Sequence, residues 1–418
     1  MFCSKRDSFY CIIELSLCVL MEKISEPRRG KSSCVYCGDA PVSHALFYGV
    51  SIFEIIFDNH IIKTTRHAPN FVKNFVDWLL LVLFETFLFF NLAKLSDDIN
   101  EAKTFRSRVI WEEAKSRGIE MKQLQMFNTL LDQYRARING KLVYFNSLPI
   151  PTKFLNMRKN WDDKFLLKTE FSKRNIPVPA YFQFPIFFPQ NLENIFSKFE
   201  KPIIVKPRVG SRGRHTVTNI HTLDQFRVGV NVAKKLCAYL VAEEHLFGYV
   251  CRATFVKGKL MGFYRGAAPF VTGDGEKTIR ELILEKDKNR RKRVEKVLIN
   301  QEIEDYILRS GFGLEDILPD KFRLFLTHRT GRLFGGATRE MLDELHPSFV
   351  PILTEAAKTV ELSVIGFDCI VPDPTKDANT QKWGIIECNT LPFIDLHYYA
   401  LEGKPKNIAG AIWDLWIQ

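Results

Sequence analysis

Two apolar segments near the end of the chain each carry a carboxylate, and this feature constrains the fold most. They are Val364–Val371, which contains Asp368, and Trp383–Cys388, which contains Glu387. Their apolar character predicts buried strands, and Asn389 would then share a face with Glu387. A buried acid without a partner is expensive, and hard divalent cations prefer such oxygen ligands. The pair therefore favours a metal site, with a structural network of acids and arginines as the alternative.

A second stretch combines an apolar strand with a basic, glycine-rich loop. Pro202–Val205 predicts a strand that ends at Lys206, and a loop with Gly210, Ser211 and Gly213 follows. Glycines allow backbone N–H groups to approach phosphate oxygens, and a lysine can neutralise phosphate charge. The spacing matches neither a Walker loop nor a Rossmann fingerprint. Taken alone, the stretch fits a phosphate site and an ordinary basic turn about equally well.

The region from about residue 160 onward alternates predicted helices and strands. Val250–Val256 and Leu260–Arg265 predict one hairpin, and Phe322–Leu326 and Arg332–Phe334 predict another. This alternation indicates an α+β fold with mixed sheets in separate subdomains rather than one doubly wound sheet. Residues 1–100 read as a separate unit whose fold the pattern does not assign.

The charge balance points to an anionic partner without choosing one. Lysine and arginine number 59 against 48 acids, a net charge of +11, and the first 100 residues hold 10 basic and 11 acidic side chains. The basic excess therefore lies beyond residue 100, where nucleic acid, a nucleotide or an acidic metabolite would suit it. The basic run at residues 287–296 lacks interleaved aromatic residues. A solvated face is therefore favoured there over a nucleic-acid site.

Nine cysteines are spread without disulfide-like spacing. Four lie in or beside apolar runs: Cys237, Cys251, Cys369 and Cys388. We expect these to be buried, reduced thiols in a reducing, cytoplasmic setting. Cys34 and Cys37 form one Cys-x-x-Cys motif, but no second pair follows at zinc-site spacing. Cys3, Cys11 or Cys18 could complete a zinc site, although this alternative is not favoured.

The N-terminal region contains two apolar stretches. Phe9–Met21 is interrupted by Glu14 and lacks a small-residue cleavage site, so no secretory signal is expected. Phe75–Ala93 contains Asp77 and Glu85, which are costly in a spanning helix. A buried or interface helix is favoured there, and membrane contact through residues 75–93 stays open as the alternative.

Further segments extend the pattern, and together they resemble the ATP-grasp superfamily. They are Asp163-Lys164 before Ile176-Pro-Val-Pro179, Ala242-Glu-Glu-His-Leu246, Val271–Leu282, Gly335–Thr338 leading to Asp343–Pro347, and Asn389–His397 with Glu402–Asn407. Within that superfamily the set is most similar to the ATP-grasp module of cyanophycin synthetase and to related amino-acid and glutathione-type ligases. The resemblance implies two α+β subdomains that clasp ATP within residues 161–418. Residues 101–160 would form a pre-ATP-grasp-like segment, and 1–100 an unassigned N-terminal region.

The resemblance also implies an activity and a set of site residues. Such enzymes are carboxylate–amine ligases that use ATP and Mg²⁺ or Mn²⁺, pass through an acyl phosphate and act on small molecules. The matching positions assign ATP contacts, metal ligands and a stabiliser of the transferring phosphoryl group. The ATP contacts would be Lys164, Lys206, Gly210, Ser211 and Gly213 at the phosphates and Glu243, Glu244, His245 and Leu246 at the adenine. Asp368, Glu387 and Asn389 would hold the metal, and Arg265 or Arg323 would stabilise the transferring group.

Some positions depart from the family pattern. Val250 stands where an acid usually contacts ribose, so Glu244 would have to serve instead, and residues 326–332 lack the usual Asn-rich segment. His397 and Lys404 are further candidates for contact with a substrate carboxylate. The N-terminal region does not match cyanophycin synthetase, so cyanophycin synthesis itself is not expected. A nucleotide-binding module without ligase activity is the main alternative, a basic nucleic-acid or membrane-associated protein is another, and a homo-oligomer stays open.

Overall fold

The computed structural model describes residues 34–38, 41–58, 70–126, 129–151, 154 and 159–417. The expectations for Phe9–Met21, Cys3, Cys11 and Cys18 fall outside these residues. The described N-terminal part contains η1 (Val35–Cys37), α2 (His44–Phe53), the π-helix η2 (Glu54–Asp58) and α4 (Asn70–Phe89).

Helix α4 covers most of the apolar stretch expected to be a helix. Phe84 is buried in a small core with β-strand residues, and the Tyr144 hydroxyl donates to the Glu85 carboxylate at 2.6 Å. Another part of the helix exposes Trp78, Leu79 and Val82. Among the described residues, no helix combines the length and apolarity that crossing a membrane requires.

An antiparallel sheet of four strands follows α4 in the chain. It runs β1 (Ala93–Ser96), β2 (Glu120–Met126), β3 (Thr129–Ile138) and β4 (Lys141–Asn146) in sequence order. The sheet thus begins before residue 100 and continues through the segment expected to precede the ATP-grasp region. The 3-10 turn η3 (Ile99–Glu101) and α5 (Phe105–Ser116) connect its first two strands.

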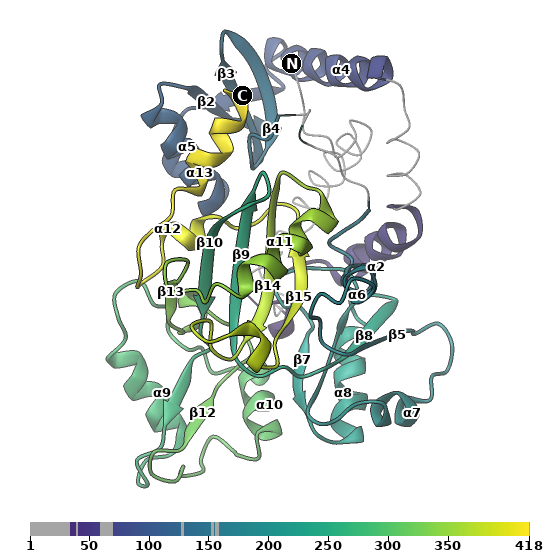
Figure 1. Ribbon diagram of the computed structural model, residues 1–418, viewed down its shortest axis with the longest axis vertical. Helices are drawn as coiled ribbons and strands as arrows, with labels where there is room; N and C mark the ends of the chain where they lie inside the picture. The colour runs from purple at the N-terminus through teal and green to yellow at the C-terminus, as the bar shows by residue number, and fades with distance from the viewer. Residues whose placement is uncertain are drawn as a thin grey trace.

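The C-terminus returns to this sheet. Helix α13 (Ile408–Trp413) and the 3-10 turn η7 (Asp414–Trp416) lie beside α5 (Figure 1). The fully buried Trp413 packs in one core with residues of α5, β3 and β4, and its indole N–H donates to the Ile110 carbonyl at 3.0 Å. The first sheet and the C-terminal segment therefore share a hydrophobic core.

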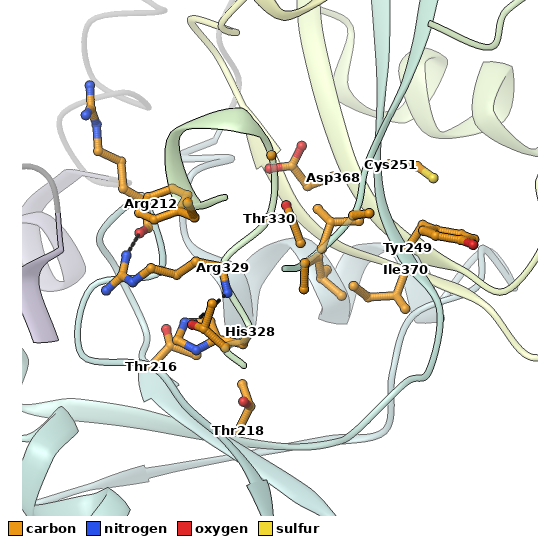
Figure 2. Close-up of a pocket in the computed structure, with 18 of the residues that line it drawn as sticks. Arg212, Thr216, Thr218, Tyr249, Cys251, His328, Arg329, Thr330, Asp368 and Ile370 are labelled. Atoms are coloured by element: carbon orange, nitrogen blue, oxygen red, sulfur yellow. Dashed lines mark hydrogen bonds between the residues drawn. The ribbon is translucent and has the colours of Figure 1, made fainter. Parts of the chain in front are cut away.

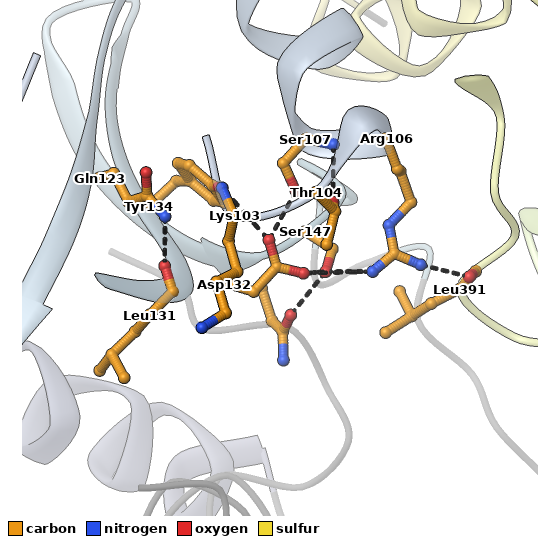
Figure 3. Close-up of polar contacts among 11 residues, drawn as sticks. Lys103, Thr104, Arg106, Ser107, Gln123, Leu131, Asp132, Tyr134, Ser147 and Leu391 are labelled. Atoms are coloured by element: carbon orange, nitrogen blue, oxygen red, sulfur yellow. Dashed lines mark hydrogen bonds and ion pairs between the residues drawn. The ribbon is translucent and has the colours of Figure 1, made fainter. Parts of the chain in front are cut away.

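A polar network also ties this sheet to the closing segment of the chain (Figure 3). The Asp132 carboxylate accepts from Arg106 at 3.2 Å and from the Ser107 hydroxyl at 2.6 Å. Arg106 also donates to the carbonyl of Leu391, two residues after Asn389. The buried arginine therefore fixes the backbone next to a predicted metal ligand.

A second antiparallel sheet carries the strand that ends at the glycine-rich loop. Its order is β5 (Tyr181–Pro185), β8 (Tyr239–Glu244), β6 (Ile203–Pro207) and β7 (Val217–Ile220). Helices α7 (Leu192–Ser197) and α8 (Leu223–Ala233) pack against it through a shared core. Helix α6 (Lys164–Ser172) begins at Asp163, whose carboxylate caps it by accepting from two backbone N–H groups.

A third antiparallel sheet holds both acid-bearing strands. Its order is β13 (Thr338–Glu340), β10 (Lys259–Gly266), β9 (Tyr249–Val256), β14 (Val364–Val371) and β15 (Gly384–Asn389). Helices α11 (Phe349–Val360) and α12 (Asp395–Tyr398) and the 3-10 turn η6 (Ala378–Thr380) complete this part. The predicted β9–β10 hairpin is confirmed, and Lys257 and Gly258 at its turn both have positive φ.

The second predicted hairpin is wrong. Strand β12 (Arg323–Phe325) pairs with β11 (Phe270–Thr272), about fifty residues earlier in the chain, and Arg332–Phe334 forms a 3-10 turn, η5. The Gly331 N–H donates to the Ala267 carbonyl. The glycine at the expected hairpin turn therefore contacts another loop and does not connect two paired strands. Helices α9 (Ile279–Lys288) and α10 (Gln301–Arg309) pack around the β11–β12 pair.

The expected α+β class is confirmed, but the sheets of the described chain are antiparallel rather than mixed. The second and third sheets form separate subdomains, with cores of their own (Figure 1). The four expected thiols, Cys237, Cys251, Cys369 and Cys388, are buried and free of disulfides.

Candidate functional site

A cavity of about 1730 Å³ lies between the second and third sheets. Figure 2 shows Asp368 on one side of it and Arg212, His328 and Arg329 on another. The residues that the resemblance assigns to ATP, metal and the transferring group all line this cavity: Lys164, Lys206, Gly210, Ser211, Gly213, Glu243, Glu244, His245, Leu246, Arg265, Arg323, Asp368, Glu387 and Asn389. The fold thus brings together segments more than 200 residues apart, while the role of each residue stays a prediction.

The acidic corner is built on the two neighbouring strands β14 and β15. Asp368 and Glu387 are direct cross-strand partners. On the other side of Asp368, strand β9 presents Arg252, which donates to both carboxylate oxygens at 2.6 Å. The Asn389 amide donates to Asp368 at 3.2 Å, which leaves the amide oxygen for another partner. Sequence reasoning missed Arg252, because a single arginine in an apolar strand carries no motif.

The two acids differ in electrostatic state. Burial opposes ionisation of Asp368, yet Arg252 holds the pKa of this carboxyl below its usual range. Glu387 has a more distant cation, with Lys164 Nζ at 3.7 Å. Burial, together with the negative charge of Asp368, raises the pKa of Glu387. Arg252 thus neutralises Asp368, whereas Glu387 has no cation in direct contact, and the oxygens of Asp368, Glu387 and Asn389 are of the kind that a hard divalent cation prefers.

The lysine end of the cavity contains a buried ion cluster. Glu243 is almost fully buried and lies 2.9 Å from Lys206 Nζ and 2.8 Å from Lys168 Nζ. Lys168 also donates to the Ile386 carbonyl at 2.7 Å. Burial lowers the pKa of Lys168 to about 8 against the opposing effect of Glu243. The Glu243 side chain thus holds Lys206 in place rather than facing a ligand, and Lys168 was missed as its anchor.

The segment predicted to contact adenine continues from the end of β8. The backbone N–H groups of Glu244 and His245 donate to the carbonyls of Ala180 and Pro202. The N–H of Leu246 has no backbone acceptor in the described part of the chain. Glu244 pairs with Lys382 at 2.9 Å and lines the cavity together with Val250. The ribose contact of Glu244 therefore stays a prediction.

The glycine-rich loop is held from two directions. Gly210 and Gly213 both adopt positive φ, which glycine accepts without steric cost. Lys164 donates to the Gly210 carbonyl, and Arg329 donates to the Arg212 carbonyl at 2.8 Å (Figure 2). Arg329 itself pairs with the buried Glu302 at 3.0 Å. This arginine comes from the segment that departs from the family pattern, and sequence reasoning missed it.

The two arginines considered for catalysis lie on strands that border the cavity. The guanidinium of Arg265 stacks over Tyr249 at 4.4 Å, and that of Arg323 over Phe270 at 4.3 Å. Neither forms an ion pair within the residues that the structure describes, so each presents a positive charge that no carboxylate of those residues neutralises.

His397 and Lys404 do not belong to the cavity wall. His397 is fully buried, with its ring nitrogens 2.5 Å from Glu340 and 2.8 Å from Thr254. Lys404 is exposed and lies outside the lining residues. His397 has a structural role in this arrangement because both of its nitrogens already have partners inside the core, and the contact of Lys404 with a substrate carboxylate stays a prediction.

Comparison with known proteins gives relatives but no matching family model. The cyanophycin synthetase of Synechocystis sp. is 27% identical over 262 residues, covering 60% of this chain and 30% of the relative. The cyanophycin synthetase of Trichormus variabilis is 26% identical over 338 residues, covering 77% of this chain and 37% of the relative. The bifunctional glutathione biosynthesis protein GshAB of Clostridium perfringens is 23% identical over 400 residues, with 87% and 50% covered. The chain thus spans about a third to a half of the length of these relatives.

Solved structures give a similar set. The bifunctional glutathione synthetase of Pasteurella multocida has a TM-score of 0.47 and 18% identity, covering 75% of this chain and 43% of that one. The ATP-grasp ligase PsnB with its minimal precursor has a TM-score of 0.35 and 13% identity, with 61% and 59% covered. The sequence relatives confirm the expected resemblance to cyanophycin synthetase and glutathione-type ligases.

Proposed function

We propose that this chain is an ATP- and Mg²⁺-dependent ligase that joins a carboxylate to an amine on an amino acid or small peptide. One observation carries the proposal. The acidic corner comes from one subdomain and Lys206 and the glycine loop from the other, and all of them face the same cavity. The similarity to enzymes named synthetases supports it.

The charge distribution suits the first step of such a reaction. A carboxylate oxygen attacks the γ-phosphorus of ATP, ADP leaves, and an acyl phosphate forms on the substrate. Both reactants are anionic, so positioning and charge neutralisation provide most of the rate enhancement. Lys164 and Lys206 would contact the phosphates from one side, and Arg265 or Arg323 would meet the transferring group from another.

The acidic corner has a different task. Asp368, Glu387 and Asn389 would hold Mg²⁺, which would supply positive charge to offset that of the phosphates. Arg252 keeps Asp368 ionised and fixes its orientation, so it acts as a positioning residue. In the second step the amine attacks the carbonyl carbon, and phosphate leaves with one former carboxylate oxygen.

The proposal extends to partners and setting. The substrates would be a small carboxylate and a small amine, and the buried, free thiols are consistent with a cytoplasmic protein. Nucleic acid is not needed to explain the basic charge, because the anionic substrates would use part of it.

ADP release in the presence of Mg²⁺ and ATP tests this function. Pools of amino acids, dipeptides and small acids would be screened against the wild type, Glu387→Gln and the exposed control Glu355→Gln. We expect turnover that requires one acid and one amine, is kept by Glu355→Gln and falls at least 100-fold in Glu387→Gln. ATP binding without turnover in any pool would favour the nucleotide-binding module, and absence of ATP binding would refute both.

A further inference from the structure

A cluster of four metal-ligand side chains lies outside the catalytic corner. Cys34, Cys37, His44 and His215 place one ligand atom each within 4.8 Å of all the others. Cys34 precedes η1 and Cys37 ends it, His44 opens α2, and His215 follows the glycine loop just before β7. Residues about 180 positions apart in the chain therefore meet at one point.

The distances match a tetrahedral zinc centre. Zinc binds thiolate sulfur at about 2.3 Å and imidazole nitrogen at about 2.05 Å, so the sulfur–nitrogen edge of a tetrahedron is about 3.6 Å. The Sγ atom of Cys37 lies 3.4 Å from His44 Nε2 and 3.5 Å from His215 Nε2. The Sγ atom of Cys34 lies 3.5 Å from His215 Nε2. These are three of the four sulfur–nitrogen edges of such a tetrahedron, and all three agree with the expected length.

The surroundings orient the ligands for this purpose. His215 Nδ1 lies 2.7 Å from the Val232 carbonyl, and a proton on Nδ1 leaves Nε2 as the free electron-pair donor. Cys37 and His215 are almost fully buried, while Cys34 and His44 are partly exposed and give the ion a route of entry. The N–H of Gly38, at positive φ, donates to the Val35 carbonyl and closes the turn that carries both cysteines.

The cluster also contacts the loop of the nucleotide site. The His215 N–H donates to the Tyr36 carbonyl at 2.9 Å. Arg329 donates to the same Tyr36 carbonyl at 3.2 Å and to the Arg212 carbonyl in the glycine loop. A Cβ at Gly38 would lie 2.6 Å from this guanidinium, so the tight turn is needed for the approach.

We propose that Cys34, Cys37, His44 and His215 bind one Zn²⁺ ion in a structural site. Four protein ligands leave no open coordination position, which is the arrangement of structural rather than catalytic zinc. The site fixes residues 34–38 and 41–44 against residues 210–215, which belong to the glycine-rich loop. Its role is thus to anchor the N-terminal part of the chain on the nucleotide-binding subdomain.

Metal content tests the site without any reference to ligase activity. The full-length protein, expressed in zinc-supplemented medium and passed through a desalting column, would be measured by inductively coupled plasma mass spectrometry. We expect about one zinc per chain in the wild type and in His221→Ala, a control whose histidine is exposed and near the same loop. In His44→Ala and Cys34→Ser we expect zinc to fall at least five-fold.

Cobalt substitution and chelation keep the test decisive if a variant folds poorly. Wild-type protein stripped of zinc and refilled with Co²⁺ should show the intense visible bands of a tetrahedral thiolate site, and strong chelators should lower its melting temperature reversibly. Zinc-free wild type with a Cys34–Cys37 disulfide would overturn the proposal. So would zinc that survives in folded His44→Ala but is lost in Cys18→Ser, because the N-terminal cysteines would then be the ligands.

Discussion

Replacement of Glu243 by glutamine tests the buried ion cluster that holds Lys206. The substitution preserves shape but removes the negative charge shared by Lys168 and Lys206, of which Lys168 is fully buried. Removing one partner of a buried ion pair costs about 3–5 kcal/mol, because the other charge is left uncompensated. We therefore expect Glu243→Gln to lower the free energy of unfolding by about 3–5 kcal/mol at pH 7.

The pH dependence of this loss follows from Lys168. In the wild type its folded pKa is about 8, below the ordinary 10.5, so it is mostly protonated at pH 7 in both states. Without Glu243 its folded pKa should fall further, so near neutral pH the unfolded chain holds up to one more proton than the folded one. Stability of the variant rises by about 1.4 kcal/mol per pH unit in that range. The difference in unfolding free energy between the wild type and the variant should thus decrease by about 1 kcal/mol between pH 7 and pH 8.

Urea unfolding followed by tryptophan fluorescence at pH 7.0, 7.5 and 8.0 measures both effects, with Glu355→Gln as the exposed control. The control should change the unfolding free energy by less than about 0.5 kcal/mol. A loss below 1 kcal/mol for Glu243→Gln at pH 7, with an unchanged denaturant slope, would show that the cluster is not buried as described. A gap that widens with pH would refute the assignment of the effect to Lys168.

Three further predictions concern other parts of the site. Arg252→Lys should lose the bidentate contact with Asp368 and lower the free energy of unfolding, measured by thermal unfolding, by about 2–4 kcal/mol. It should also reduce ATP-dependent turnover, and unchanged turnover would contradict the positioning role of Arg252. Burial lowers the pKa of His245 from 6.5 to about 4. As the pH falls, the histidine is therefore protonated in the unfolded chain before it is protonated in the folded one. The free energy of unfolding should thus decrease between pH 6.5 and pH 4, by at most about 3 kcal/mol. His245→Gln should flatten that part of the stability curve, and an unaltered curve would exclude this histidine as its cause. A Cβ at Gly248 would lie 2.5 Å from the Val371 backbone, whereas Gly311 also has positive φ but has open space around it. Gly248→Ala should therefore lower the free energy of unfolding by about 1–3 kcal/mol more than Gly311→Ala. Equal melting temperatures of the two variants would refute the close approach.

The parts of the site that sequence predicts best are those with local signals. The turn residues Lys257 and Gly258 mark the β9–β10 hairpin, and acids embedded in apolar strands mark Asp368 and Glu387. Such features arise from backbone geometry and burial cost, which act within a few residues. The resemblance then connects these local signals into one cavity.

The missed residues depend on contacts between distant segments. Arg252, Lys168 and Arg329 are ordinary basic residues in the sequence, and only the packing of strands and loops shows that each has a buried acid beside it. The proposed zinc ligands also come from distant segments of the chain. A search for a second cysteine pair overlooks His215, which reaches Cys34 only because the glycine loop folds back to η1.

The central claim is phosphoryl transfer to a carboxylate in this cavity, and an oxygen label tests it most directly. The carboxylate found in the ADP screen would be prepared with ¹⁸O in its carboxyl group and turned over with ATP, Mg²⁺ and the amine. Mass spectrometry of the released inorganic phosphate should show one ¹⁸O atom per turnover, transferred through the acyl phosphate. Unlabelled phosphate, with amide product formed at the same rate, would contradict the proposed chemistry.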